Sequence, residues 1–221
     1  LGSYDTALQH LFEALPKLQE YGDKKIEAQA LYHIFCSYYF LADYDNALKY
    51  AHEMLNRAKH NEDLLSQANA FNAIGTLCYT TNQNQKALEA LLNGLTIANS
   101  LDDKHLLARI LDGIGTAHFN LNEIEKSIEF KKKALDVSRS IGLKQIESYA
   151  IDGLAKIYLE ANDLSNAEIY LHECLKIREE LNFKSGIAET NFQLGDLYLN
   201  MNRLDYALSH LNTALKIAEE T

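Results

Sequence analysis

The feature that most constrains the fold is an internal repeat with a period of 40 residues. A small residue followed by an apolar one recurs at this spacing in Ala7-Leu8, Ala47-Leu48, Ala87-Leu88 and Ala207-Leu208. A column of leucines keeps the same period without an insertion or deletion, and it comprises Leu15, Leu55, Leu95, Leu135, Leu175 and Leu215. A fixed period of this length is typical of proteins that stack one supersecondary unit, each copy of which contacts its neighbours.

The apolar residues within one period predict two amphipathic helices separated by a polar turn. Steps of three and four residues connect Ala68, Phe71, Ile74, Gly75 and Cys78, and they recur after the turn in Ala87, Leu88, Leu91, Leu92 and Leu95. The asparagine of the turn recurs as Asn82, Asn122, Asn162 and Asn202. Because Asn tolerates the left-handed conformation, we expect it to end the first helix. Residues that satisfy free amides or complement the dipole at the start of the second helix are expected at Asp45, Glu125, Ser165 and Asp205.

The period divides the chain into a half unit and five helix pairs. The half unit covers residues 1–23, and the pairs cover 24–63, 64–103, 104–143, 144–183 and 184–221. Pro16 should kink or end the leading helix, predicted near residues 4–20, because proline removes a backbone hydrogen bond and crowds the preceding turn. We interpret residues 1–221 as a single domain. Since the sequence begins without Met and ends inside a helical pattern, we expect it to be a fragment of a longer protein.

Charge and cysteine content exclude several classes of function. The 21 Lys and Arg against 31 Asp and Glu give a formal net charge of −10, which argues against nucleic acid as a partner and favours basic segments. Cys36, Cys78 and Cys174 form no Cys-x-x-Cys pair, so we expect a reducing, cytoplasmic setting. No apolar run reaches the roughly 18 residues of a membrane span, so no membrane partner is expected.

The sequence contains no recognisable catalytic or metal-binding motif. His52-Glu53 and His172-Glu173 begin like the helix of a zinc protease, but the second histidine is missing at the fifth place. His33 and Cys36 stand one helical turn apart, yet no third ligand is evident. There is no Gly-rich phosphate loop and no Gly-x-Ser-x-Gly elbow. We therefore expect no catalytic residue, no cofactor and no metal site, and interpret the chain as something other than an enzyme.

Along essentially the whole chain, the units carry a pattern that resembles the tetratricopeptide repeat signature, each with a departure at a different place. One reads Phe71, Ile74-Gly75, Cys78, Ala87, Leu91 and Gly94, and another reads Asn191, Leu194-Gly195, Tyr198, Ala207, Leu211 and Ala214. The period exceeds the usual 34 residues of the family. The chain is therefore most similar to the long-helix members found in bacterial regulators and sensor kinases, kinesin light chains and polarity adaptors. The resemblance implies an all-α fold, a right-handed superhelical α-solenoid of antiparallel helix pairs.

In that family the first helix of each pair lines the concave face, which indicates where a partner would bind. The resemblance assigns to this groove Gln29, Tyr32, Asn69, Asn72, Thr76, Arg109, Asp112, Tyr149, Asp152 and Lys156. Amide and tyrosine side chains suit the backbone of an extended peptide, although a solvated helix face is the alternative. The two-carboxylate clamp that some members use for chaperone C-termini is not expected, since Arg109 alone supplies a suitable charge. Arg109 with Asp112, and Lys156 with Asp152, are interpreted as helix-surface ion pairs.

Two further columns on the first helices leave alternatives open. Ala73, Gly113 and Gly153 would form either a shallow trough for a bound chain or a close contact between adjacent first helices, and we favour the contact. The aromatic column Tyr39, Tyr79 and Phe119 would be either shared core or a platform for a ligand, and we favour the core.

The sequence thus predicts a cytoplasmic scaffold that binds a peptide or protein segment in its concave groove, as the sensory or regulatory module of a larger signalling protein. The alternative is an assembly module that forms homo-oligomers through its terminal helices, because the apolar face of residues 204–221 lacks a cap.

Overall fold

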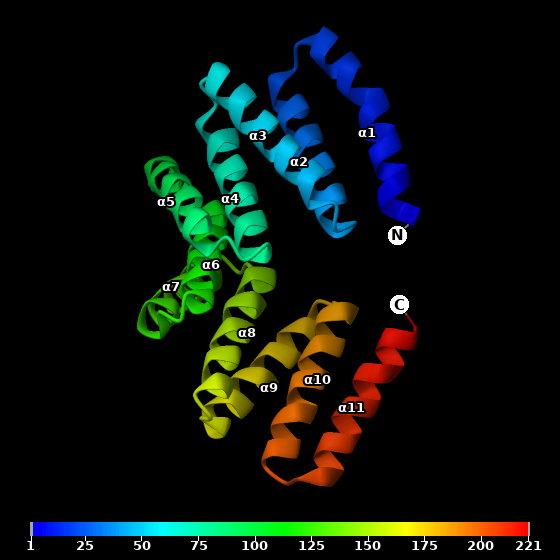
Figure 1. The fold of residues 1–221 in the computed structure, drawn as a ribbon, viewed down its shortest axis with the longest axis vertical. Coiled ribbons are helices and arrows are strands. Elements are labelled where there is room, and N and C mark those ends of the chain that lie inside the picture. The colour runs from blue at the N-terminus through cyan, green and yellow to red at the C-terminus, as the bar shows by residue number, and fades with distance from the viewer. Residues whose placement is uncertain (1, 221) are drawn as a thin grey trace. The chain divides into compact units, whose positions relative to one another are not determined.

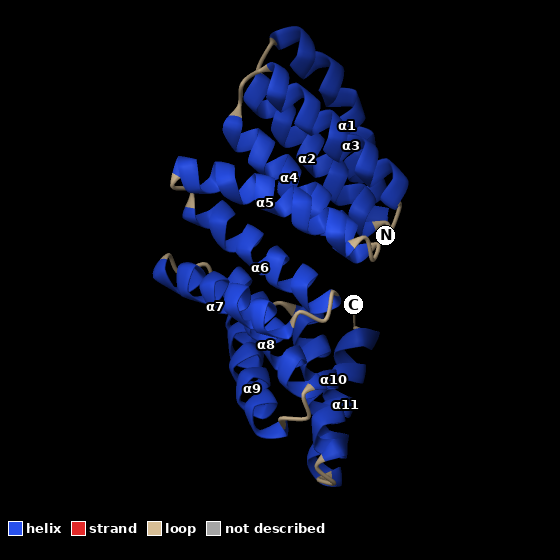
Figure 2. Ribbon diagram, turned by 60° about the vertical axis from the view of Figure 1, so that its left-hand side comes forward, coloured by secondary structure: helices blue, strands red, loops and turns tan. Residues whose placement is uncertain are grey.

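The computed structural model describes residues 2–220, and these residues form eleven α-helices and no strand (Figure 1, Figure 2). The helices are α1 (Gly2–Tyr21), α2 (Lys24–Phe40), α3 (Tyr44–His60), α4 (Leu64–Thr80), α5 (Asn84–Leu101), α6 (Lys104–Asn120), α7 (Ile124–Ser140), α8 (Lys144–Glu160), α9 (Leu164–Glu180), α10 (Lys184–Asn200) and α11 (Leu204–Glu219). The predicted all-α fold is confirmed.

Backbone contacts divide the chain into two compact units, Leu1–Leu121 and Asn122–Thr221. In the first unit each helix from α1 to α6 packs on the next, and the first helices α2, α4 and α6 also contact one another in sequence. In the second unit each helix from α7 to α11 packs on the next. The predicted pair 104–143 is divided between these units, so its pairing and the single-domain interpretation stay predictions.

Of the residues predicted at the start of the second helices, Asp45, Glu125 and Asp205 lie in the first turns of α3, α7 and α11, where they complement the helix dipole as predicted. Asp43 and Asp163 are the N-caps of α3 and α9, and the Oδ1 atom of each accepts a hydrogen bond of 3.2 Å from the backbone N–H three residues later. Ser165 is the exception: the cap of α9 is Asp163, two residues earlier.

The helix ends repeat every 20 residues, which is half of the 40-residue period. A residue with positive φ follows each helix from α1 to α10, once every 20 residues: Gly22, Ala42, Glu62, Asn82, Asp102, Asn122, Gly142, Asn162, Asn182 and Asn202. The four asparagines predicted to adopt this conformation do so, with φ between 56° and 60°. At Ala42 the turn is closed by hydrogen bonds from the Ala42 N–H to Tyr39 O and from the Asp43 N–H to Tyr38 O.

Ala42 adopts this conformation at a cost, because its Cβ crowds the backbone where φ is 58°. The variant Ala42→Gly is expected to raise the free energy of unfolding by about 0.5–1 kcal/mol, the relief of strain exceeding the added flexibility of glycine in the unfolded chain. Chemical denaturation measures this gain. Ala161→Gly is the matched control. Ala161 has φ −74°, so the same substitution relieves no backbone strain there and should lower the free energy of unfolding. Equal effects of the two substitutions would contradict the argument.

The expectation that Pro16 ends its helix early is wrong. α1 runs through Pro16 and five residues further, to Tyr21. The fixed φ of proline is itself helical, so the cost is confined to one lost hydrogen bond and local crowding. Helix α1 packs against α2, with Leu8 and Leu15 buried ahead of the proline.

Small residues bring the paired helices close together, as the repeat predicts. Ala47, Ala87 and Ala167 are fully buried, and Ala207 is nearly so. A Cβ added to Gly75 of α4 would lie 2.5 Å from Leu91 Cγ of α5, and one added to Gly195 of α10 would lie 2.5 Å from Leu211 Cγ of α11. The glycines therefore accommodate leucines of the partner helix, and at Gly195 the added Cβ would also lie 3.5 Å from Ala207 O.

The column of Ala73, Gly113 and Gly153 is packed, so the trough interpretation is wrong. A Cβ on Gly113 would lie 3.2 Å from Leu91 Cδ2 of α5 and 3.6 Å from Tyr79 Cε1 of α4. On Gly153 it would lie 2.5 Å from Lys131 Cε of α7. The close contact is thus made largely with the preceding second helix, in addition to the adjacent first helix.

Candidate functional site

Three of the predicted groove residues meet in the first unit. Arg109 of α6 donates from Nη2 to Asn69 Oδ1 of α4 at 2.5 Å. Its Nη1 atom lies 3.5 Å from Tyr32 OH of α2, at the limit of a hydrogen bond. Three successive first helices therefore contribute one side chain each to a single polar cluster, the Arg109 cluster.

The Arg109 cluster carries a positive charge. Burial raises the pKa of the Tyr32 hydroxyl and that of the neighbouring Cys36 thiol, and Arg109 only partly opposes the effect. Both groups are therefore neutral near pH 7. Within residues 2–220, no ion pair joins Arg109 to a carboxylate, so the half-buried guanidinium is balanced by a phenol and an amide alone.

A hollow of about 300 Å³ adjoins this cluster between α2 and α4. Gln29, Tyr32 and Asn69, all predicted groove residues, line it together with Lys25, His33, Asp63 and Ser66. Gln29 is exposed, and Tyr32 and Asn69 are half-buried. Amide, phenol and charged groups thus face a space that an extended peptide side chain could enter.

The predicted surface pair of Lys156 and Asp152 is present, with the Lys156 side chain 41% exposed, and it continues inward into a network with the buried Arg178 in the second unit. Lys156 Nζ lies 2.7 Å from Asp152 Oδ2 and 3.1 Å from Glu189 Oε1. Arg178 of α9, whose side chain is 1% exposed, brings Nη1 to 3.7 Å from Asp152 Oδ1 and 3.3 Å from Glu189 Oε2. Burial acts to lower the pKa of Lys156, but the two carboxylates outweigh it and the pKa is raised.

Arg178 is also held by neutral groups. Its Nη1 atom donates to Gly186 O at 3.0 Å and to Thr190 Oγ1 at 2.7 Å, while its guanidinium lies over the Phe183 ring at 5.9 Å. Next to it, burial raises the pKa of the Cys174 thiol to about 11. The surroundings of Arg178 are therefore strongly desolvated.

Arg178 was not predicted from the sequence, although the repeat contains a signal for it. The equivalent positions 40, 80 and 120 residues earlier are Ser138, Ala98 and Ala58, all small and buried. A large charged residue in a column of small buried ones indicates a special environment. No motif search would detect this, because Arg178 belongs to no motif.

The other predicted groove residues differ in accessibility. Asn72 is only 9% exposed and Asp152 only 6%, so little of either polar group is left for a ligand. Thr76 and Asp112 are half-buried on α4 and α6. Tyr149 on α8 is half-buried, accepts a hydrogen bond from Gln145 Nε2 at 3.2 Å and meets the Phe183 ring edge-on.

The aromatic column is only partly covered, so its assignment to the shared core stays a prediction. Tyr39, Tyr79 and Phe119 are half-buried. Tyr39 stacks on Phe35, and its hydroxyl lies 3.1 Å from Thr80 Oγ1 of the adjacent first helix.

Two further observations concern membranes and metals. None of the described helices combines the length and apolarity that crossing a bilayer requires. In the part of the chain that the structure describes, no three His, Cys, Asp or Glu side chains are grouped so that they could hold a metal ion.

Comparison with known proteins decides the family. The tetratricopeptide repeat model matches residues 66–140 and 146–220, which together make up more than half of the chain. The chain belongs to the tetratricopeptide repeat family. A search of curated proteins gives no match.

Solved structures share the fold at low sequence identity. BtubC (BKLC) from P. vanneervenii has a TM-score of 0.78 and 15% identity, over 98% of this chain and 91% of that one. A Rap protein complexed with competence and sporulation factor has a TM-score of 0.78 and 15% identity, over 99% and 71%. A Pyrococcus horikoshii STAND protein (Signal Transduction ATPase with Numerous Domains) with a tetratricopeptide repeat sensor has a TM-score of 0.73 and 19% identity, over 99% and 33%. At such identities the likeness concerns the tetratricopeptide solenoid fold alone.

Proposed function

We propose that the chain is a non-catalytic binding module that holds a peptide or protein segment against the first helices of its first unit. The observation that carries this proposal is the convergence of Tyr32, Asn69 and Arg109 from α2, α4 and α6 beside a hollow of about 300 Å³. Groups with both donors and acceptors, placed on rigid helices, suit the backbone of an extended chain. A Rap protein of the same fold is complexed with competence and sporulation factor, which supports a binding role for this fold.

The ligand segment should carry a carboxylate that reaches Arg109. A half-buried guanidinium without a carboxylate partner gains a charge-assisted, bidentate hydrogen bond when one arrives. The net charge of −10 favours basic partners at long range, but screening limits such effects to about 10 Å, while pairing at Arg109 acts at contact. A segment with basic flanks suits the long-range attraction. One carboxylate in that segment, from an acidic side chain or from its C-terminus, can pair with Arg109.

The regulatory role is the finer part of the proposal. A STAND protein carries a tetratricopeptide repeat sensor of this fold, which supports a sensory module within a signalling protein. The Arg109 cluster would then recognise the signal, and the response would be produced elsewhere.

The test uses a displayed library of random 12-residue peptides selected on the chain. Peptides recovered in this way are expected to bind Arg109→Gln at least tenfold more weakly, because their carboxylate loses its partner. Asn69→Ala should weaken binding as well, since Asn69 holds the Arg109 guanidinium. Affinities are measured by isothermal titration calorimetry.

Arg203→Gln is the matched control. Arg203 is an exposed arginine at the N-cap of α11 that lies 3.5 Å from Glu168, remote in sequence from the cluster, and its loss should leave binding unchanged. Selection of no peptide, or of peptides that bind Arg109→Gln and Asn69→Ala at full affinity, would show that the groove is not the binding site.

A second candidate, assembly through terminal helices, is favoured by one observation. Leu204, Leu208 and Leu215 of α11 are 59–62% exposed and share one helix face. Leu88 and Leu135, the repeat equivalents of Leu208 and Leu215, are 8% and 6% exposed. An apolar stripe that is covered elsewhere in the repeat thus remains open on α11, which supports association of this face with another segment or copy.

A further inference from the structure

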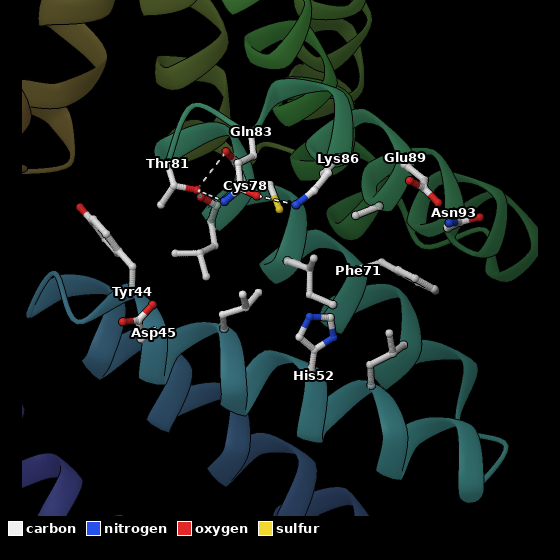
Figure 3. Close-up of a pocket in the computed structure, with 15 residues that line it drawn as sticks. Tyr44, Asp45, His52, Phe71, Cys78, Thr81, Gln83, Lys86, Glu89 and Asn93 are labelled. Carbon is white, nitrogen blue, oxygen red and sulfur yellow. Dashed lines mark hydrogen bonds between the residues drawn. The ribbon is translucent and has the colours of Figure 1, made fainter.

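A second hollow, of about 350 Å³, lies in the first unit with α4 as its floor and α3 and α5 as its walls (Figure 3). It is here called the α3–α5 pocket. Leu55, Leu77, Cys78 and Ala90 line it and are all less than 9% exposed. Polar side chains form its rim, and Figure 3 shows His52 extending from α3 toward α4, opposite Lys86 of α5.

The repeat explains why a hollow exists here. In three other helix pairs the positions equivalent to Cys78 and Ala90 hold two aromatic rings that stack on each other. The stacked pairs are Tyr38–Tyr50 at 5.6 Å and 10°, Tyr158–Tyr170 at 5.4 Å and 8°, and Tyr198–His210 at 5.5 Å and 22° between centroids and ring planes. The first ring comes from the first helix of the pair and the second ring from the second helix.

The α4–α5 pair has the same helices but neither ring. Cys78 and Ala90 are small, so the apolar side chains around them line open space where the other pairs have stacked rings. Protein interiors are close-packed, and apolar atoms that line a gap lose dispersion contacts. Burial raises the pKa of the Cys78 thiol, so the floor of the pocket is neutral at pH 7.

We propose that the α3–α5 pocket binds a small planar aromatic compound of one or two rings, stacked where the other repeats place their own aromatic side chains. Its volume lies at the lower end of the roughly 300–1,000 Å³ of ligand pockets. The neutral apolar floor accommodates the ring faces. Lys86, whose Nζ donates to Gln83 Oε1 at 2.8 Å, and His52 provide polar groups for a ring substituent.

This site differs from the groove of the proposed function. The groove residues Tyr32, Asn69 and Arg109 do not line the α3–α5 pocket. Its residues come from α3, from the α4 face with Phe71, Ile74 and Cys78, from the following turn and from α5. The two proposals can therefore fail independently.

The test uses p-cresol, which has the ring and hydroxyl of a tyrosine side chain. Titration into the methyl-labelled chain is expected to give saturable NMR shifts of the Leu55, Ile74 and Leu77 methyl groups, because an aromatic ring shifts the resonances of the groups it covers. The methyl groups of Leu171, buried in the second unit, should not move. The saturated analogue 4-methylcyclohexanol should bind at least tenfold more weakly, since it cannot stack as a planar ring.

Variants locate the site. Ala90→Tyr places in the pocket the side chain that Tyr50 and Tyr170 place in the equivalent positions, and p-cresol affinity should fall at least tenfold. Gln85→Tyr is the matched control, because it adds the same side chain to an exposed position of α5 outside the pocket and should leave affinity unchanged. The shift map and the saturated analogue test the proposal in the unaltered chain, even where Ala90→Tyr misfolds.

The proposal would be overturned by shifts that do not saturate or that spread over both units, by equal affinity for 4-methylcyclohexanol, or by unchanged affinity in folded Ala90→Tyr. At least tenfold tighter binding of N-acetyltyrosinamide than of p-cresol would also overturn it. That result would mean that the pocket takes the aromatic side chain of a partner protein.

Discussion

Replacement of Arg178 by methionine should lower the free energy of unfolding by about 3 kcal/mol, a loss typical of breaking a buried ion pair by removing one partner. The side chain is 1% exposed, and its charge lies close to Asp152, which is 6% exposed. Removing the arginine leaves Asp152 buried with Lys156 as its remaining cationic partner. It also takes a donor from Gly186 O and Thr190 Oγ1.

Some buried polar atoms of the network around Arg178 form no hydrogen bond within residues 2–220, and this indicates which variant should recover stability. Asp152 Oδ1 and Arg178 Nε lack a hydrogen-bond partner among the described residues, and the separation of Asp152 Oδ1 from Arg178 Nη1 is 3.7 Å. The cost of removing Arg178 should therefore arise mainly from the buried Asp152 carboxylate, whose charge is then left with Lys156 alone. The double variant Arg178→Met, Asp152→Asn should recover about 1 kcal/mol or more relative to the sum of the single changes, because it removes that buried charge.

Arg139→Met is the matched control. The Arg139 side chain is 44% exposed and pairs with Glu147 and Glu173 at 2.9 and 2.5 Å. Exposed ion pairs of this kind contribute about 0–1 kcal/mol to the free energy of unfolding. Chemical denaturation of these three variants and of Asp152→Asn gives the comparison, and equal losses in Arg178→Met and Arg139→Met would contradict a structural role for the buried Arg178.

Most of the fold could be predicted from the sequence because the repeat is uninterrupted. Ala47, Ala87, Ala167 and Ala207 occur in one column, and a column that stays small across the chain must lie where helices approach closely. The helix ends were harder, since Ala42 and Glu62 adopt positive φ without being glycine or asparagine. Their position at a helix end in the 20-residue repeat determines this conformation, although alanine and glutamate by themselves favour negative φ.

The candidate sites were predictable only in part. Aligning the repeats places Asn69 and Arg109 in one column, but the column does not reveal that Arg109 reaches back past α4 to Tyr32 of α2. That contact depends on side-chain length and on the offset between helices. The α3–α5 pocket was missed for another reason: sequence motifs record residues that are present, whereas this pocket arises from rings that Cys78 and Ala90 lack.

The second large effect is expected at the contact between α4 and α5. Ala87→Phe should lower the free energy of unfolding by about 1–3 kcal/mol, because Ala87 is fully buried and the two helices leave no room for a ring. The closeness of this contact is visible one turn later on α5, where Leu91 lies against Gly75 so tightly that a Cβ on the glycine would come within 2.5 Å of Leu91 Cγ. A phenyl group at Ala87 must push the helices apart and disturb that neighbouring contact.

Gln85→Phe serves as the control for this change, since it adds the same ring two residues earlier on α5 at an exposed position. Its expected effect is within about 0.5 kcal/mol, the usual range for surface substitutions. The midpoint of chemical denaturation measures both variants. An unchanged midpoint in Ala87→Phe would mean that the small-residue column does not set the distance between paired helices. The same physical argument would then fail for Ala47, Ala167 and Ala207, because the repeat gives all four residues equivalent surroundings.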